Sequence, residues 1–268
     1  MKNRILMTAL LVPALGSCFP PGSPMSEFGP AQVSLAAYFD HSGQDLFVDL
    51  SPSVLNSTGL SVDYGPWSFM QFGIFLGATE FDVALPETRL SDPDAFAYNA
   101  DFSLSAGGSL KLATPRFASN TTRVVAFGST TYLNSEDVHG NSKTGLIYNA
   151  GATIQYLFLN RVNFVLGGEF YTLIGEQKRA NDGRVEVFGT SNPAGVVDYG
   201  RGIVGVEYYF KGSNRPFVSV AFRPTGSIGW HDELGLRGAS ISISLGALAS
   251  LGKEKLDADE EDAGMIDQ

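Results

Sequence analysis

A strict alternation of polar and apolar residues between positions 99 and 112 constrains the fold of this chain most strongly. Every odd position there is polar or glycine, and every even position is apolar or glycine. A period of two is typical of a β-strand with one wet and one dry face, whereas an amphipathic helix repeats its apolar stripe at three and four residues. The odd positions are Asn99, Asp101, Ser103, Ser105, Gly107, Ser109 and Lys111.

The same alternation recurs along the chain and predicts ten strands between residues 31 and 248. Short connections are expected at Gly65-Pro66, 114–120, Asn160-Arg161 and 212–216. Long polar loops are expected at 40–59, 80–96, 134–145, 176–200 and 224–237. The predicted strands are Gln32–Phe39, Leu60–Tyr64, Trp67–Gly77, Asn99–Leu112, Thr121–Leu133, Leu146–Phe158, Val162–Leu173, Arg201–Lys211, Phe217–Arg223 and Gly238–Ala247.

Strand length and composition together favour a barrel over a soluble β-sandwich, which also alternates. Several predicted strands are longer than the five or six residues that are usual in soluble sheets, and they suit tilted membrane strands of roughly 9–11 residues. Only 17% of the residues are charged and 12% are aromatic. We therefore predict an all-β protein, a closed antiparallel transmembrane β-barrel of about ten strands (eight to twelve), with short periplasmic turns and long outer loops.

The two ends of the chain differ from this middle part. Lys2, Arg4 and the apolar stretch that follows predict a signal peptide over residues 1–17. Residues 18–30 are rich in proline and predict a linker, and residues 249–268 predict an acidic disordered tail. Cys18 is the only cysteine, and the preceding Leu15-Gly16-Ser17 resembles the lipobox of bacterial lipoproteins. Cys18 is thus a candidate for lipidation, or an incidental residue, or a residue removed with the signal peptide.

Two segments, GLIYNAGATIQYLFLNRVNFVLGGEFYTLIG and GIVGVEYYFKGSNRPFVSVAFRP, resemble small Gram-negative outer-membrane barrels of the OmpA and OmpW kind. This resemblance implies an outer-membrane protein whose partner is the lipid and whose role is structural or that of a narrow pore. The alternative is a surface adhesin that binds ligands through loops 80–96 and 176–200. Small solutes or surface ligands are the expected binding partners; no cofactor is expected, and the net charge of −10 argues against nucleic acid.

Charged residues on the wet faces of the predicted strands are the candidate site. We expect them to face the lumen, where they line an ion path or pair as a plug. The pairing of Glu169 and Glu207 with Arg201 and Arg223 favours the plug, as does the side-chain filling usual in small barrels. The candidates are Asp101, Lys111, Glu169, Arg201, Glu207 and Arg223, with Asp63 and Lys211 on the same faces.

Aromatic residues near strand ends predict a girdle at the lipid interface. They are Tyr148, Tyr156, Phe158, Tyr208, Tyr209, Phe210, Phe217 and Phe222.

Catalysis has little support in the sequence, so the chain is not expected to be an enzyme. The three histidines, His41, His139 and His231, all fall in predicted loops. They could bind a metal, or His231 beside Asp232 could act as a base in a barrel-type hydrolase. Neither a ligand spacing nor a nucleophile motif accompanies them, so solvated loop residues are the favoured interpretation and no metal site is predicted.

Overall fold

The computed structural model describes residues 30–46, 51–83, 98, 101–189, 199–211, 214–226 and 240–251. Within these ranges the chain forms β-strands joined by turns, and no helix long and apolar enough to cross a membrane occurs among them. The strands are β1 (Gln32–Leu46), β2 (Ser51–Trp67), β3 (Met70–Val83), β4 (Ser103–Ala113), β5 (Thr122–Glu136), β6 (Ser142–Phe158), β7 (Val162–Lys178), β8 (Val185–Gly189), β9 (Tyr199–Tyr209), β10 (Pro216–Arg223), β11 (Thr225–Gly226) and β12 (Ser240–Ser250).

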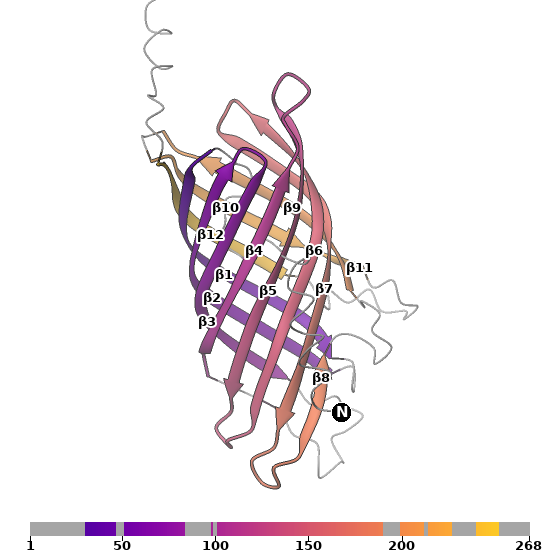
Figure 1. The fold of residues 1–268 in the computed structure, drawn as a ribbon. Helices are drawn as coiled ribbons and strands as arrows, with labels where there is room; N and C mark the ends of the chain where they lie inside the picture. Colours follow the sequence, from indigo (N-terminus) through magenta and orange to yellow (C-terminus); the bar gives the residue numbers. More distant parts are fainter. Residues whose placement is uncertain are drawn as a thin grey trace, which may run out of the picture.

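Ten of these twelve strands close into one antiparallel barrel with steeply inclined strands (Figure 1). Strands β1 to β7 pair in sequence order, β7 then pairs with β9, and β9 continues through β10 to β12. The pairing of β12 with β1 closes the ring. The predicted closed antiparallel barrel of about ten strands is confirmed.

The two short strands lie at one rim of the barrel. Strand β8 pairs with the last residues of β7, from Ile174 to Lys178, while β7 pairs with β9 over its earlier part. Strand β11 pairs with the first residues of β9. We call this rim the long-loop end, and the opposite rim, which holds the turns β2–β3, β4–β5, β6–β7 and β9–β10, the short-turn end.

Several strand ends differ from the sequence prediction. The predicted loop 40–59 is wrong, because β1 and β2 continue to pair in register from Asp40↔Ser57 to Leu46↔Ser51. Backbone pairing needs no apolar side chain, so strands continue where the outward residues become polar. The predicted turn at Gly65-Pro66 is also wrong, since β2 runs to Trp67 with a register irregularity between Tyr64 and Trp67. A proline without an N–H group fits such an irregular position.

The outer face of the barrel carries an apolar band. Its side chains alternate with buried ones along each strand, and Ile74, Leu104 and Leu166 are 68%, 67% and 63% exposed. At the short-turn end the band finishes in aromatic side chains: Trp67 stacks on Phe69 with ring centroids 5.7 Å apart. The aromatic residues exposed at this end also include Phe117, Phe158 and Phe210.

At the long-loop end the outer face turns polar along a line that crosses neighbouring strands. His41, Asn56 and Glu80 are register partners on β1, β2 and β3. Their side chains form a chain in which His41 Nδ1 lies 2.6 Å from Asn56 Oδ1 and Asn56 Nδ2 donates to Glu80 Oε2 at 2.8 Å. On β5, β6 and β7 a second polar line consists of the register partners Asn134, Thr144 and Glu176.

Apolar clusters and polar clusters follow one another inside the lumen. The inward residues of β7 include Asn163, Val165, Glu169, Tyr171 and Leu173, so polar and apolar levels alternate on one strand. Tyr209 and Phe217 also point inward, 1% and 0% exposed, which makes their predicted place in an aromatic girdle wrong. They pack with Ala36 and Leu248 because they share a face with the lumen residues of β9, β10, β1 and β12.

Glycines on the inner face make room for the aromatic rings that fill the lumen. A side chain at Gly107 would overlap the ring of Phe75, and one at Gly151 would overlap the ring of Phe127. Each pair places a large inward ring beside a residue without a Cβ on the neighbouring strand. The high glycine content therefore serves close packing inside a narrow barrel.

Candidate functional site: the polar interior of the barrel

Five of the six predicted lumen charges lie inside the barrel. Their residues are no more than 6% exposed. Asp101 is the exception, because it is exposed and precedes β4, so its predicted place in the lumen is wrong. Lys211 is likewise exposed beyond the end of β9, whereas Asp63 is fully buried on β2. The five are Lys111, Glu169, Arg201, Glu207 and Arg223.

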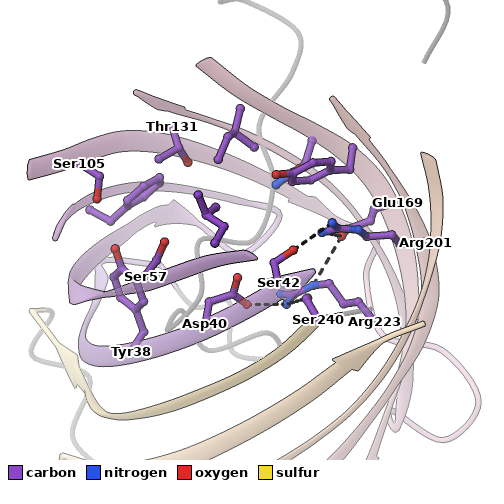
Figure 2. A pocket seen from close by; sticks show the side chains of 15 residues that line it. Tyr38, Asp40, Ser42, Ser57, Ser105, Thr131, Glu169, Arg201, Arg223 and Ser240 are labelled. Atoms are coloured by element: carbon purple, nitrogen blue, oxygen red, sulfur yellow. Dashed lines mark hydrogen bonds and ion pairs between the residues drawn. The ribbon is translucent and has the colours of Figure 1, made fainter. Parts of the chain in front are cut away.

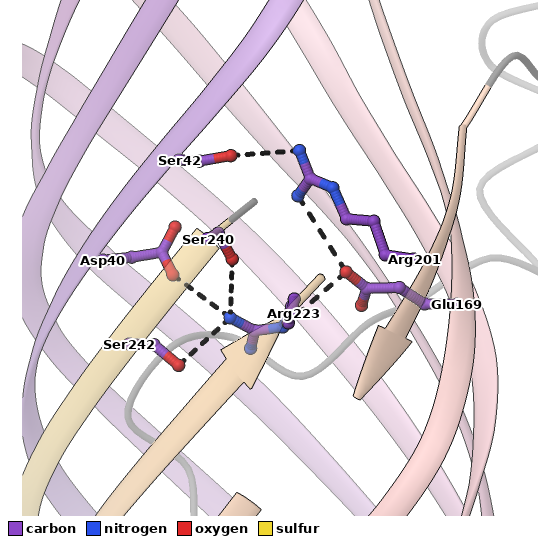
Figure 3. A network of polar contacts seen from close by, with 7 residues as sticks. All are labelled: Asp40, Ser42, Glu169, Arg201, Arg223, Ser240 and Ser242. Atoms are coloured by element: carbon purple, nitrogen blue, oxygen red, sulfur yellow. Dashed lines mark hydrogen bonds and ion pairs between the residues drawn. The ribbon is translucent and has the colours of Figure 1, made fainter. Parts of the chain in front are cut away.

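Two arginines and two carboxylates meet in the half of the lumen nearer the long-loop end; we call them the Arg223 cluster (Figure 3). Arg223 Nη1 lies 3.2 Å from Asp40 Oδ1, and Arg223 Nε lies 3.6 Å from Glu169 Oε1. The same Glu169 oxygen is 4.0 Å from Arg201 Nη1. Glu169 thus bridges both guanidinium groups, and its ion pairs connect β7 with β9 and β10. The ion pair of Asp40 with Arg223 connects β1 with β10.

Serine hydroxyls surround this cluster. Arg201 Nη2 donates to Ser42 Oγ at 3.0 Å, and Arg223 Nη1 donates to Ser240 Oγ at 3.2 Å and Ser242 Oγ at 3.0 Å. The guanidinium carbon of Arg201 also lies 3.8 Å from the ring centroid of Tyr171. Each guanidinium is therefore held by several groups, as a buried cation requires.

A second polar group, the Lys111 cluster, lies nearer the short-turn end. Lys111 Nζ is 3.3 Å from Asp63 Oδ1 and donates to Gln71 Oε1 at 3.2 Å. Ser34 Oγ donates to the other oxygen of Asp63 at 3.4 Å. On the facing strands Asn163 Nδ2 donates to Glu207 Oε2 at 3.4 Å, and Arg123 Nε donates to Gln155 Oε1 at 3.2 Å.

Each cluster balances its own charge. The Arg223 cluster contains two carboxylates and two guanidinium groups, and the Lys111 cluster contains Asp63 and Glu207 with Lys111 and Arg123. Placing ions out of water costs several kcal/mol each unless opposite charges and hydrogen bonds compensate. Glu207 was predicted to pair with the arginines of β9 and β10, but it lies in the Lys111 cluster. Its register partner on β7 is Asn163, which lies six residues before Glu169, whereas Glu169 is paired with Arg201.

Four polar residues of these clusters were missed by the sequence reasoning. Asp40 and Ser42 were assigned to a loop, although Ser34, Ala36, Tyr38, Asp40 and Ser42 continue one alternating face of β1. Arg123 lies at the start of β5, where the alternation was weak, and Gln71 is an uncharged partner on β3. Continuing the period of two through polar residues would have found the first two.

A cavity opens in the lumen beside the Arg223 cluster (Figure 2). It contains about 540 Å³ of space not filled by atoms, counting its open side. Its wall combines the charged groups of the cluster with hydroxyl, amide, aromatic and aliphatic side chains. The lining residues are Tyr38, Asp40, Ser42, Leu55, Ser57, Phe75, Ser105, Thr131, Ile147, Asn149, Glu169, Tyr171, Arg201, Arg223 and Ser240.

Tyr98 is buried in the lumen toward the long-loop end. It precedes β4 and is 1% exposed, within an apolar cluster that includes Phe81 and Leu133. Its hydroxyl lies 2.7 Å from Ser135 Oγ, and Lys143 Nζ lies 3.9 Å from the centroid of its ring. Burial raises the pKa of the Tyr98 hydroxyl from 10.0 to about 12.

The raised pKa of Tyr98 predicts a loss of stability in strong alkali. The unfolded chain releases the phenolic proton near pH 10, whereas the folded chain holds it until about pH 12. Tyr98 therefore contributes fully to stability below pH 10, and this contribution falls as the pH rises from 10 to 12. Urea unfolding of the wild type and of Tyr98→Phe across this range checks the prediction. The free energy of unfolding should fall less steeply with pH in the variant, and equal slopes would contradict the prediction.

The histidines show no catalytic or metal-binding arrangement in the described part of the chain. His41 lies within β1 on the outer face, not in a loop as predicted, and His139 lies in the β5–β6 turn. His231 and Asp232 lie outside the described residues. Among the residues that the structure describes, no group of three potential metal ligands comes together. Cys18, the signal peptide, the linker up to residue 29 and the tail from residue 252 also lie outside them.

No protein-family model and no curated protein sequence matches the chain. Among solved structures, the outer-membrane protease OmpT from Escherichia coli is 9% identical with a TM-score of 0.39, over 84% of this chain and 98% of that chain. The monoaromatic hydrocarbon channel CymD is 12% identical with a TM-score of 0.36, over 85% and 90%. The translocator domain of the autotransporter NalP from Neisseria meningitidis is 10% identical with a TM-score of 0.43, over 93% and 94%. The more specific resemblance to OmpA and OmpW stays a prediction.

Proposed function

We propose that this chain is an integral protein of the bacterial outer membrane whose barrel spans the lipid and whose lumen is closed to general diffusion. The observation that carries the proposal is the outer face, an apolar band bounded by aromatic side chains at one end and by a polar line at the other. A soluble protein rarely exposes a continuous apolar surface on this scale. The same band, flanked by aromatic residues, is what a membrane barrel presents to lipid.

Closure of the sheet supports the same conclusion. Lipid offers no hydrogen bonds to backbone N–H and C=O groups, so a sheet in a membrane must have no free edge. Here β1 pairs with β12 over eleven register positions, from Gln32↔Ser250 to Ser42↔Ser240. The ring of hydrogen bonds is therefore continuous along the length that the apolar band covers.

The filled lumen favours a structural role over that of an open pore. Four clusters of side chains follow one another along the barrel axis, starting nearer the short-turn end. They are the Lys111 cluster, an apolar cluster around Phe127 and Ile203, the Arg223 cluster and the apolar cluster around Tyr98. Each level joins side chains from several strands. Such a barrel holds its outer loops in place without passing solutes freely. Binding of surface ligands through loops 80–96 and 176–200 stays a prediction, as does the absence of enzymatic activity.

We expect the refolded chain to produce no discrete conductance steps in a planar lipid bilayer. The reason is that two charge-balanced clusters and three apolar clusters occupy the lumen. A porin inserted under the same conditions shows that single channels are detectable. Discrete steps from the wild-type chain would replace the structural role by that of a narrow pore.

Membrane insertion is tested separately from conductance. The membrane fraction is washed with carbonate and run on a denaturing gel with and without boiling. An inserted barrel resists the wash and migrates differently before and after boiling. Complete extraction by carbonate together with unchanged migration would overturn the outer-membrane proposal.

A further inference from the structure

The cavity beside the Arg223 cluster has hydroxyl groups around much of its wall (Figure 2). Ser57 and Thr79 lie 3.0 Å apart through their hydroxyl oxygens, and Thr79 donates to Ser105 at 2.9 Å, so a short ladder of hydroxyls supports this side. Figure 2 shows the ion pairs of Glu169, Arg201 and Arg223 on the opposite side. A solute in the cavity would therefore face hydroxyls on one side and planar charged groups on the other.

The charges around the cavity compensate one another. Asp40 and Glu169 oppose Arg201 and Arg223, with ion pairs of 3.2 to 4.0 Å. A solute with net charge would enter a site whose ions are already paired and would have to leave part of its own hydration uncompensated. A neutral polar solute avoids this cost.

Two of the residues that line the cavity each carry a buried atom without a hydrogen-bond partner within the protein. The atoms are Arg201 Nε, which can only donate, and Asn149 Oδ1, which can only accept. Arg201 is 5% exposed, so bulk water does not readily satisfy its Nε. Buried polar atoms without a partner are rare in proteins, and a bound solute is one way to satisfy them. A hydroxyl group both donates and accepts, so a solute with several hydroxyls matches both atoms.

The cavity also offers an apolar surface. Tyr171, with Arg201 stacked on its ring at 3.8 Å, lies on the same wall as Leu55 and Ile147. Cavities that combine apolar side chains with a few well-placed polar groups are typical of small-molecule sites. They suit a molecule that has C–H faces as well as hydroxyls.

From these features we infer that the lumen cavity binds a small neutral polyhydroxylated solute of the mono- or disaccharide class. Hydroxyls of the solute bond to Asn149, Arg201 and the hydroxyl-lined wall, and its C–H face packs against the apolar part of the wall at Leu55 and Ile147. The cavity has an open side and needs no passage through the barrel, so this inference does not depend on conductance. It goes beyond the structural role proposed above.

The test uses the full chain refolded in detergent micelles, with folding checked by its heat-modifiable migration. Saturation-transfer NMR titrations compare D-glucose and maltose with glycine, a zwitterion, and acetate, an anion. We expect saturable transfer to at least one of the two sugars and none to glycine or acetate. Saturable binding of glycine or acetate without the sugars would overturn the inference, and so would the absence of binding by both sugars.

Paired variants separate a site in the cavity from binding elsewhere on the micelle. Tyr38→Phe combined with Thr131→Val removes two hydroxyls from the cavity wall, and we expect sugar affinity to fall about tenfold, because each hydrogen bond contributes roughly 0.5–1.5 kcal/mol. Tyr209→Phe combined with Ser219→Ala is the matched control, since both residues are buried in the lumen but do not line the cavity. Equal affinities in the two double variants would place the sugar elsewhere and overturn the inference, even if the wild type binds it.

Discussion

Replacing Lys111 with methionine is expected to lower the free energy of unfolding by about 3–5 kcal/mol, the usual cost of breaking a buried ion pair. The substitution keeps the aliphatic stem but removes the ammonium group that lies 3.3 Å from Asp63 Oδ1 and 3.2 Å from Gln71 Oε1. The Lys111 cluster would then hold two carboxylates against one guanidinium. Urea unfolding of the barrel in phospholipid vesicles measures the change.

A double variant shows whether charge causes this loss. In Lys111→Met combined with Asp63→Asn, both members of the pair are neutral and the side-chain volumes are nearly kept. We expect the double variant to recover most of the stability that the single variant loses, because the cluster is balanced again by Glu207 and Arg123. A double variant as unstable as Lys111→Met would show that packing around Lys111, and not charge balance, holds this part of the lumen together.

Replacing Ile74 with arginine is expected to destabilise the barrel in phospholipid vesicles by about 2–4 kcal/mol, the cost of a lipid-facing arginine near the middle of a bilayer. Ile74 lies on β3 within the apolar band and is 68% exposed. In a soluble protein an exposed isoleucine would accept this change at almost no cost. The substitution therefore measures directly whether the outer face meets lipid.

Asn134→Arg is the matched control for this experiment. Asn134 also points outward, but it lies on the polar line of β5 with its register partner Thr144. Near the interface the cost of an arginine is expected to fall to about 0–1 kcal/mol. If Ile74→Arg and Asn134→Arg change the unfolding free energy equally, the apolar band does not lie in the hydrocarbon region.

The sequence predicted which way side chains point better than it predicted where strands end. Alternation fixes the two faces of a strand, so it places Lys111 and Glu169 inside and Ile74 outside once the ring is closed. It gives no information on a neighbouring strand's register, and for this reason it did not show that Glu169 bridges two arginines while Glu207 lies in another cluster.

Strand ends were missed for a different reason. Beyond the apolar band the outward side chains are polar, as at His41 and Asn56, so the contrast between the two faces disappears although the backbone pairing continues. Tyr209 was assigned to the girdle because it lies near a strand end. It points to the inner face, because it is two residues from Glu207 on the same strand. The alternation along the strand is a stronger signal than position near its end, since neighbouring residues of a strand point to opposite faces.

The pairing of β1 with β12 joins residues more than 190 positions apart, as in Ser42↔Ser240. Strand β1 obtains its second neighbour only when β12, the last of the described strands, has been made. Until then one edge of β1 exposes unpaired backbone N–H and C=O groups, and the apolar outer face is exposed to water. Closure of this barrel must therefore follow synthesis of β12, and a truncation that removes β12 is expected to leave a chain with unpaired strand edges that aggregates before it enters a bilayer.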